Sequence, residues 1–372
     1  MQNFKLVSPC LLGMEGLVAE ELRKMDAQNV EPQNGRVVFD GSEEMLVRAN
    51  IGSRYSERVL VQMGSFQAFS FEQLFESVKA LPWEEWIGKN DRFPVKGRSL
   101  SSKLSSIPDC QSIIKKAIVE RLKLKYKVNW FEETGTLYQI QFLILKDTVS
   151  IMIDTSGEGL HKRGYRASST EAPIKETLAA GMVHLSRVRH NAHFIDPFCG
   201  SGTILIEAAM YALNIAPGMR RHFSAENWAQ IQPSVWQKEK ERAQSLVMHD
   251  AAFTANGYDI DGAAVSLTLE NAKKAGVIAQ IRAEKRSIDD FQSIGEYGCV
   301  ICNPPYGERL LDIQQAEDIY RTMGNVFERK RGWSYSIISP DETFEECFGS
   351  KADRRRKLYN GMIKCQYYMY FK

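Results

Sequence analysis

A short loop with polar, cyclic and aromatic side chains follows an apolar run late in the sequence. The run is Cys-Val-Ile-Cys at residues 299–302, and the loop continues with Asn303, Pro304, Pro305 and Tyr306. Four such residues are typical of a buried strand, and prolines cannot continue the hydrogen-bond ladder of a central strand. The strand is therefore predicted to end at Asn303. The loop after it would lie where open α/β sheets bind their ligands.

These residue types are suited to chemistry on an aromatic amine. The amino group of a nucleic-acid base is a poor nucleophile because its lone pair is delocalised into the ring. Two acceptors that hold its N–H bonds would turn the lone pair toward an electrophile such as a sulfonium methyl group. The side-chain oxygen of Asn303 and the carbonyl of Pro304 can be these acceptors, and Pro305 helps to fix the loop. Tyr306 can stack on the base, and alignment then supplies most of the catalysis, with no metal. The alternative is that the four residues form only a rigid turn.

A glycine loop earlier in the chain could bind a cofactor. Residues 196–203 read Asp-Pro-Phe-Cys-Gly-Ser-Gly-Thr, with a strand predicted up to Asp196 and a helix from Thr203. Glycines allow close approach of a ligand, and the start of a helix offers free N–H groups. Leu205 stands where a dinucleotide fingerprint needs its third glycine, and no P-loop lysine follows. Asp196 suits the cationic amino-acid end of S-adenosylmethionine better than a pyrophosphate, although a purely structural turn is the alternative.

Further acids follow the next two predicted strands. Asp259 is the candidate acceptor for ribose hydroxyls, with Asp261 as the second choice. Asp290 could accept a hydrogen bond from an adenine amine. Asp259 and Asp290 could instead be N-caps of helices.

Length and composition describe an ordinary globular protein. The 372 residues suggest two domains, and 44% hydrophobic with 25% charged residues is a normal balance. We expect no membrane span, because no apolar stretch is long enough. Seven irregularly spaced cysteines imply no disulfide framework, and residues 299 and 302 alternate within a strand rather than marking a metal site. We therefore expect reduced thiols and a cytoplasmic location.

The pattern of elements predicts an α/β protein in two parts. Residues 1–155 are mixed α+β, with helices near 15–25, 70–80 and 112–124, and strands near 35–39, 137–145 and 148–154. From residue 174 helices (175–185, 203–213, 237–256, 263–275, 316–329) alternate with strands (193–196, 256–259, 280–283, 298–302, 335–339, 365–371). Alternation of this kind predicts a mostly parallel sheet with helices on both faces. The last strand is expected to be antiparallel.

The sequence resembles the class I S-adenosylmethionine methyltransferases that modify exocyclic amines. More narrowly, it resembles THUMP-domain RNA methyltransferases of the RlmL (YcbY) type, whose N-terminal half methylates the 2-amino group of guanine in large-subunit ribosomal RNA. Six motifs in this order carry the resemblance: His161-Lys-Arg-Gly-Tyr-Arg166, Ala172-Pro-Ile-Lys-Glu-Thr-Leu-Ala-Ala180, Asp196-Pro-Phe-Cys-Gly-Ser-Gly-Thr203, Ala216-Pro-Gly218, Asn303-Pro-Pro-Tyr-Gly-Glu-Arg309 and Lys357-Leu-Tyr-Asn-Gly361.

The resemblance implies a Rossmann-like methyltransferase domain at 156–372 and an RNA-binding region at 1–155, made of a ferredoxin-like segment and a THUMP module. The predicted catalytic residues are Asn303, Pro304, Pro305 and Tyr306. The predicted cofactor-binding residues are Lys175, Thr177, Asp196, Phe198, Cys199, Gly200, Gly202, Thr203, Asp259, Asp290 and Asn303. Some relatives carry a second methyltransferase domain, and this chain stops at Lys372, so the target base can differ.

The expected partner is structured RNA, and ribosomal RNA in particular. Ten Lys or Arg against two acids stand between residues 92 and 127, although the net charge of the whole chain is only +2. Such a patch can meet phosphates, or it can be a solvated helix face. The predicted RNA-binding residues are Arg92, Lys96, Lys103, Lys115, Lys116, Lys123, Arg163 and Arg166. We expect a monomer.

The leading hypothesis is methylation of a base amine in RNA, most specifically the 2-amino group of guanine in 23S ribosomal RNA. A first alternative is an adenine-amine methyltransferase that acts on DNA. A second is a non-catalytic RNA-binding protein that uses S-adenosylmethionine only structurally. A third, a nicotinamide-dependent oxidoreductase, is disfavoured by Leu205 in the glycine loop.

Overall fold

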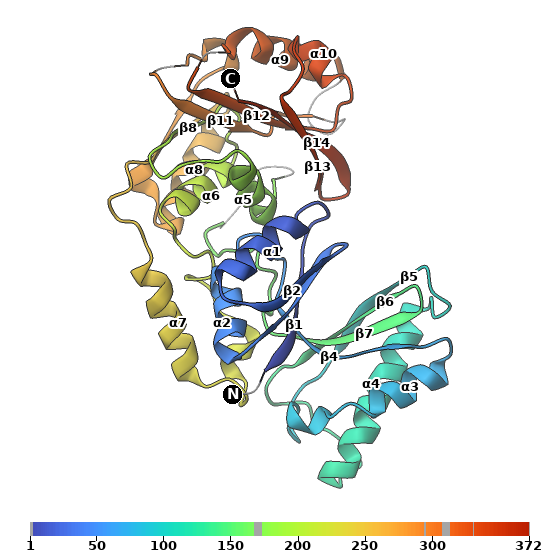
Figure 1. Cartoon of the computed structure of the whole chain (residues 1–372). Coiled ribbons are helices and arrows are strands. Elements are labelled where there is room, and N and C mark those ends of the chain that lie inside the picture. Colours follow the sequence, from blue (N-terminus) through green and yellow to red (C-terminus); the bar gives the residue numbers. More distant parts are fainter. Residues whose placement is uncertain (1–2, 167–172, 294, 307–312, 330, 372) are drawn as a thin grey trace.

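The computed structural model contains two seven-stranded sheets, one from each part of the chain (Figure 1). It describes residues 3–166, 173–293, 295–306, 313–329 and 331–371. Two of the six motifs extend beyond these ranges, because residues 172 and 307–309 lie outside the described residues.

The first sheet has the strand order β2-β3-β1-β4-β7-β6-β5. Its strands are β1 (Phe4–Pro9), β2 (Gln28–Gln33), β3 (Arg36–Gly41), β4 (Leu60–Gln67), β5 (Val95–Leu100), β6 (Gln139–Leu145) and β7 (Thr148–Asp154). Helices α1 (Glu15–Lys24) and α2 (Glu43–Gly52) belong to one half, and α3 (Phe71–Lys79) and α4 (Ile107–Tyr126) to the other (Figure 1). Strand β4 pairs with both β1 and β7 and so makes one continuous sheet of the two halves.

The second sheet has the order β10-β9-β8-β11-β12-β14-β13. Its strands are β8 (His193–Asp196), β9 (Thr254–Asp259), β10 (Ile281–Lys285), β11 (Gly298–Cys302), β12 (Trp333–Ser339), β13 (Arg354–Asn360) and β14 (Ile363–Tyr370). The first five strands in that order are parallel, and β14 is antiparallel to both β12 and β13. The predicted fold class, with its antiparallel last strand, is confirmed.

Helices cover both faces of the second sheet. Helices α5 (Glu176–Leu185), α6 (Thr203–Ala212) and α8 (Gly262–Ala275) lie on one side, and α9 (Ile313–Val326) and α10 (Phe344–Phe348) on the other (Figure 1). Successive strand residues alternate between the two apolar layers, so that Phe194 packs in one and Ile195 in the other. A strand buried on both faces is apolar along its buried length, which is why β11 reads as an apolar run and β8 has Phe194 and Ile195 at its centre. Short 3₁₀ helices lie at η1 (Trp83–Glu85), η2 (Ser224–Asn227), η3 (Ile278–Gln280) and η4 (Ile288–Asp290).

Part of the segment between helix α6 and strand β9 packs against the first part of the chain. It contains η2 and helix α7 (Pro233–Ser245), which runs beside α2 (Figure 1). Trp228 stacks on Tyr138 with ring centroids 4.7 Å apart, and its indole N–H donates to the carbonyl of Leu137. At Gly181 in α5, an added Cβ would lie 1.9 Å from the terminal methyl of Met14. These close contacts hold the two sheets in a defined arrangement.

Most elements with a strong periodic pattern lie where the sequence predicts them. Strands β7, β8 and β11 have the predicted bounds, whereas β1, β2, β4, β5 and helix α2 were not predicted. The predicted helix 237–256 is confirmed only as far as Ser245, where α7 ends, and is wrong beyond it, because β9 begins at Thr254. The basic run Arg354-Arg-Arg-Lys357 lies in strand β13.

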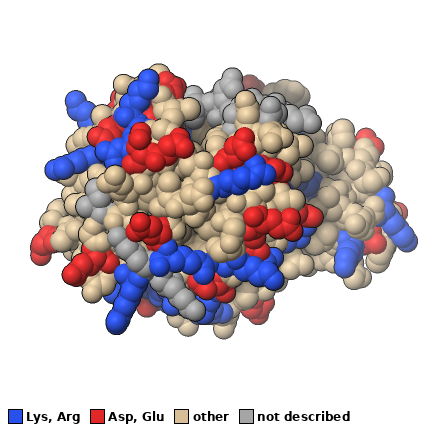
Figure 2. Space-filling view, turned by 90° about the horizontal axis from the view of Figure 1, so that it is seen from above, with Lys and Arg blue, Asp and Glu red and all other residues tan. Residues whose placement is uncertain are grey.

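The charges are mixed over the face that Figure 2 shows, where Lys and Arg side chains alternate with Asp and Glu side chains. This agrees with the formal net charge of +2. Any binding of a polyanion must therefore rest on local clusters rather than on the charge of the whole chain. Among the described residues, no helix has the length and apolar character to cross a membrane.

Candidate active site

Three strand ends meet at one edge of the second sheet. Strand β8 lies between β9 and β11, and all three are parallel, so their carboxyl ends share one edge. Asp196 at the end of β8 pairs in register with Gly257, two residues before Asp259. Val300 in β11 pairs in register with Ile195 in β8, so the ends of these two strands are neighbours. The glycine loop and the Asn303 loop therefore begin side by side.

The glycine loop is held from behind by strand β9 and helix α8. Gly202 has φ +81°, and a Cβ there would lie 2.9 Å from the methyl group of Thr268. The Gly200 N–H donates to Asp259 at 3.0 Å, and the Thr268 hydroxyl donates to the Gly200 carbonyl at 2.8 Å. Asn271 donates to the Ser201 carbonyl at 3.0 Å. Only glycine fits at position 202, and the loop backbone is fixed before any ligand arrives.

Asp196 is a buried acid with few partners. It is 1% exposed, and one of its oxygens accepts a hydrogen bond from the N–H of Phe198 at 3.0 Å. Burial, with a smaller contribution from the charge of Asp259, raises the pKa of Asp196 to about 8. A carboxyl group held neutral by burial regains its charge when a cation comes next to it.

The other predicted cofactor-binding acids differ from Asp196 in exposure. Asp259 is half-buried and also accepts from the N–H of Asp261 at 3.0 Å. Asp261, the second choice for the ribose hydroxyls, is the N-cap of helix α8, and Ser287 is the N-cap of η4. Asp290 is exposed at the end of η4.

The start of helix α5 is tied to the first part of the chain through Glu57. The Thr177 hydroxyl donates to one oxygen of Glu57 at 2.6 Å, and the Lys175 ammonium lies 3.1 Å from the other. His161 Nδ1 lies 3.4 Å from that second oxygen. Burial opposes ionisation of Glu57, yet His161, Thr177 and Lys175 together lower its pKa to about 2. Glu57 was not predicted as a site residue.

Asn303 carries a buried hydrogen-bond acceptor. Its side-chain oxygen is buried and has no hydrogen-bond partner among the described residues. Pro304 after it is buried, and Pro305 is half-buried. The Tyr306 hydroxyl accepts from the side-chain amide of Asn360 at 2.7 Å, which ties its ring to the end of β13. A buried carbonyl oxygen without a partner is costly, so such an atom points to a ligand N–H as its partner.

The residues predicted to bind RNA are in different situations. Arg92, Lys96, Lys103 and Lys116 are exposed. In contrast, Lys115 pairs with Glu133 at 2.5 Å, and Lys123 pairs with Glu120 at 2.9 Å.

Two predicted RNA contacts have structural partners instead. Arg163 is only 3% exposed, so its prediction as an RNA-binding residue is wrong. Its guanidinium donates to the carbonyls of Leu160 and Arg54 and faces the buried Glu207. Arg166 donates to the Thr203 hydroxyl at 2.6 Å and is mostly buried beside the glycine loop.

Three family models match successive parts of the chain. Residues 5–60 match the RlmL ferredoxin-like domain, residues 68–154 the THUMP domain, and residues 163–369 the RMKL-like methyltransferase domain. The candidate RNA methyltransferase YpsC of Bacillus subtilis (strain 168) is 44% identical over 373 residues, which cover 100% of this chain and 97% of the relative.

Solved structures of similar proteins cover the whole chain. One is a protein from Listeria monocytogenes str. 4b F2365 that is called a predicted N6-adenine-specific DNA methylase. It has a TM-score of 0.94 at 42% identity, over 100% of this chain and 97% of that one. Another is SMU.472, a candidate methyltransferase complexed with SAH. It has a TM-score of 0.94 at 39% identity, over 100% of this chain and 98% of that one.

The fold and these matches define a class I methyltransferase that depends on S-adenosylmethionine. Within that class, the chain belongs to the family of RMKL-like methyltransferases, and it also carries an RlmL ferredoxin-like domain and a THUMP domain. The sheet edge fits this cofactor, because position 202 has no room for a Cβ and Asp196 is a buried acid beside the loop. We propose that the predicted cofactor-binding residues, from Lys175 to Asn303, hold it there.

The titration of Asp196 gives a testable pH dependence. Its pKa is raised, so the carboxyl group is mostly protonated below pH 8 and gains its charge as the pH rises through that value. Raising the pH from 7 to 8 is expected to tighten binding of S-adenosylhomocysteine, whose amino-acid end carries an ammonium group, about fivefold, because the ionised fraction of Asp196 grows by that factor. Isothermal titration calorimetry between pH 7 and pH 8 measures this change in affinity. Asp196→Asn should remove the dependence while the exposed Asp289→Asn keeps it, and an equal slope in Asp196→Asn would contradict the assignment.

Proposed function

We propose that this protein methylates an exocyclic base amine in RNA, and most specifically the 2-amino group of guanine in 23S ribosomal RNA. The observation that carries the proposal is the side-chain oxygen of Asn303, a buried acceptor without a partner among the described residues. It follows strand β11, beside the strand that leads into the glycine loop. A donor group at that edge and an amine bound by Asn303 would be neighbours.

The chain's own residues would bind and orient the base rather than react with it. The side-chain oxygen of Asn303 and the carbonyl of Pro304 would accept the two N–H groups of the amine. The lone pair of the nitrogen then points away from both acceptors and out of the ring plane. Tyr306, whose hydroxyl is held by Asn360, would stack on the base. S-Adenosylmethionine supplies a methyl group on a positively charged sulfur, and a paired base would have to flip out to reach it.

RNA is favoured over DNA by the first part of the chain. The THUMP domain match and the RNA methyltransferase relative YpsC support an RNA substrate. An adenine amine in DNA is the second candidate, because the Listeria relative bears that name and an acceptor pair can hold any exocyclic amine.

Nucleoside mass spectrometry separates these substrates. The purified protein is incubated with labelled S-adenosylmethionine and either protein-free 23S ribosomal RNA or duplex DNA, and the products are digested to nucleosides. The proposal expects labelled N2-methylguanosine from RNA. Labelled N6-methyladenine in DNA, with no product in RNA, would replace it with the second candidate. A label in neither substrate would count against the RNA proposal.

Exposed lysines of the THUMP half should contribute to RNA affinity. Lys96 lies on β5, the edge strand of the first sheet, and Lys103 follows it in the next loop. Replacing both with alanine is expected to weaken RNA binding severalfold and to reduce the salt slope of log K by about 1 to 2, since up to two phosphate contacts are lost. Filter binding at several salt concentrations measures both. Lys238→Ala on helix α7, on the opposite side of the molecule in Figure 1, is the control. An unchanged slope in the double variant would remove these lysines from the RNA surface.

A further inference from the structure

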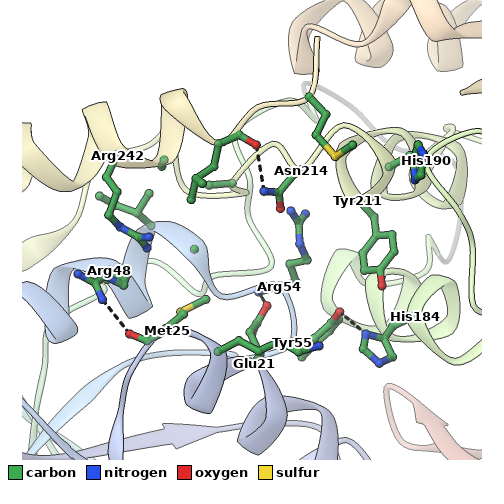
Figure 3. A pocket seen from close by; sticks show the side chains of 18 of the residues that line it. Glu21, Met25, Arg48, Arg54, Tyr55, His184, His190, Tyr211, Asn214 and Arg242 are labelled. Atoms are coloured by element: carbon green, nitrogen blue, oxygen red, sulfur yellow. Dashed lines mark hydrogen bonds between the residues drawn. The ribbon is translucent and has the colours of Figure 1, made fainter. Parts of the chain in front are cut away.

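A cavity lies between the two parts of the chain, away from the strand ends. Its volume is about 550 Å³, within the range of small-molecule sites. Residues of α1, α2 and the segment after α2 line one side, and residues of α5, α6 and α7 line the other (Figure 3). None of the residues proposed to bind cofactor or base lines it.

Arg54 is the unusual residue of this cavity. It is 8% exposed, and its Nη1 is buried with no hydrogen-bond partner among the described residues. Its backbone is used elsewhere, because its N–H donates to Glu21 and its carbonyl accepts from Arg163. The guanidinium lies 5.7 Å from the ring centroid of Tyr211 and extends toward Asn214 (Figure 3). A buried guanidinium with an unused donor carries a desolvation cost that an anion would offset.

The acids around the cavity do not balance its cations. Glu239 is the carboxylate shared by Arg48, at 2.9 Å, and Arg242, at 2.8 Å. Glu21 accepts hydrogen bonds from the Ser53 hydroxyl and the Arg54 N–H, and burial raises its pKa. The full set of charged Lys, Arg, Asp and Glu residues in the lining is Glu21, Lys24, Arg48, Arg54, Arg189, Glu239 and Arg242. Two further acids outside the lining pair with its cations, Glu20 with Lys24 at 2.6 Å and Asp26 with Arg48 at 3.1 Å. Five cations then face four acids, and an excess of one positive charge remains.

We propose that this cavity binds a phosphate-bearing ligand of nucleotide size, with Arg54 as the buried anchor. A guanidinium offers its donors in a planar fork that matches phosphate oxygens, and Arg189 and Arg242 add further donors to the same lining. Tyr211 and His190 also line the cavity and offer rings for the remainder of such a ligand. The phosphate can belong to a free nucleotide or to the end of an RNA chain.

Titration calorimetry with the full chain tests the site. The probes are inorganic phosphate, AMP, GMP and a short RNA with and without a 5′-phosphate. Saturable one-to-one binding is expected for at least one phosphate-bearing probe, and Arg54→Met should weaken it at least about tenfold, the loss of one charge-assisted pair. Arg187→Ala, an exposed arginine outside the cavity, is the matched control and should bind as the wild type does. Tighter binding of the 5′-phosphorylated RNA than of either mononucleotide identifies an RNA end as the source of the phosphate, and the reverse identifies a free nucleotide.

A second variant keeps the proposal testable if Arg54→Met does not fold, which circular dichroism would show. Arg189 is exposed at the edge of the cavity, so Arg189→Glu should preserve the fold and weaken phosphate binding about fivefold or more through its reversed charge. No saturable binding of any probe to the wild type at millimolar concentration overturns the proposal. Equal binding by a folded Arg54→Met does so as well, and if that variant is unfolded, equal binding by Arg189→Glu decides against it.

Discussion

Replacing Asn303 with alanine is expected to lower the turnover of methyl transfer by about two to three powers of ten. The change removes the buried side-chain oxygen that has no partner among the described residues. On the proposed mechanism this oxygen is one of two acceptors that turn the lone pair of the amine, and losing one positioned partner costs that much in other enzymes. Single-turnover assays with saturating RNA and cofactor measure the chemical step directly.

Two comparisons make this result specific. Asn303→Asp keeps an acceptor oxygen at the same position and is expected to retain more turnover than Asn303→Ala. Asn256→Ala, a half-buried asparagine within β9 of the same sheet, should leave turnover nearly unchanged. If the protein only binds RNA, Asn303→Ala will leave its biological effect intact. Turnover within about threefold of the wild type would likewise remove Asn303 from the proposed role.

The sequence predicts the strand ends well because their residues have only one physical interpretation. An apolar run followed by Asn-Pro-Pro must be a buried strand that stops, and β11 ends at Cys302 as predicted. In the same way, Asp196 is followed by two glycines, and β8 ends there. Parallel order then places both ends at one edge without further information.

The supports of the site depend on tertiary contacts that no local pattern encodes. Glu57 binds Thr177 and Lys175 across more than a hundred residues of sequence, and nothing around it marks it. Thr268 in α8 holds the glycine loop, yet it reads as an ordinary polar residue of an amphipathic helix. Strand β5 alternates between half-buried and exposed residues, and its exposed Lys96 and Arg98 were interpreted as part of a basic patch rather than as strand positions.

Arg163→Met is expected to lower the free energy of unfolding by about 3–5 kcal/mol, because it leaves Glu207 as an unpaired buried charge. The side chains of both residues are at most 1% exposed. Arg163 also donates to the carbonyls of Leu160 at 2.7 Å and Arg54 at 2.6 Å, so the change orphans two further acceptors. Chemical denaturation followed by tryptophan fluorescence measures the loss.

The neighbouring residue provides the control, and a double variant tests the cause. Lys162 is largely exposed and pairs only with the exposed Glu158 among the described residues, so Lys162→Met should change stability by less than about 0.5 kcal/mol. Arg163→Met combined with Glu207→Met removes both charges and should recover about half of the loss, whereas the orphaned carbonyls keep the rest. A stable Arg163→Met with weakened RNA binding would restore Arg163 as an RNA contact. If Arg163→Met is destabilised and its folded fraction binds RNA normally, the role of Arg163 is structural. It then joins Glu207 of the methyltransferase domain to the carbonyl of Arg54 in the ferredoxin-like domain.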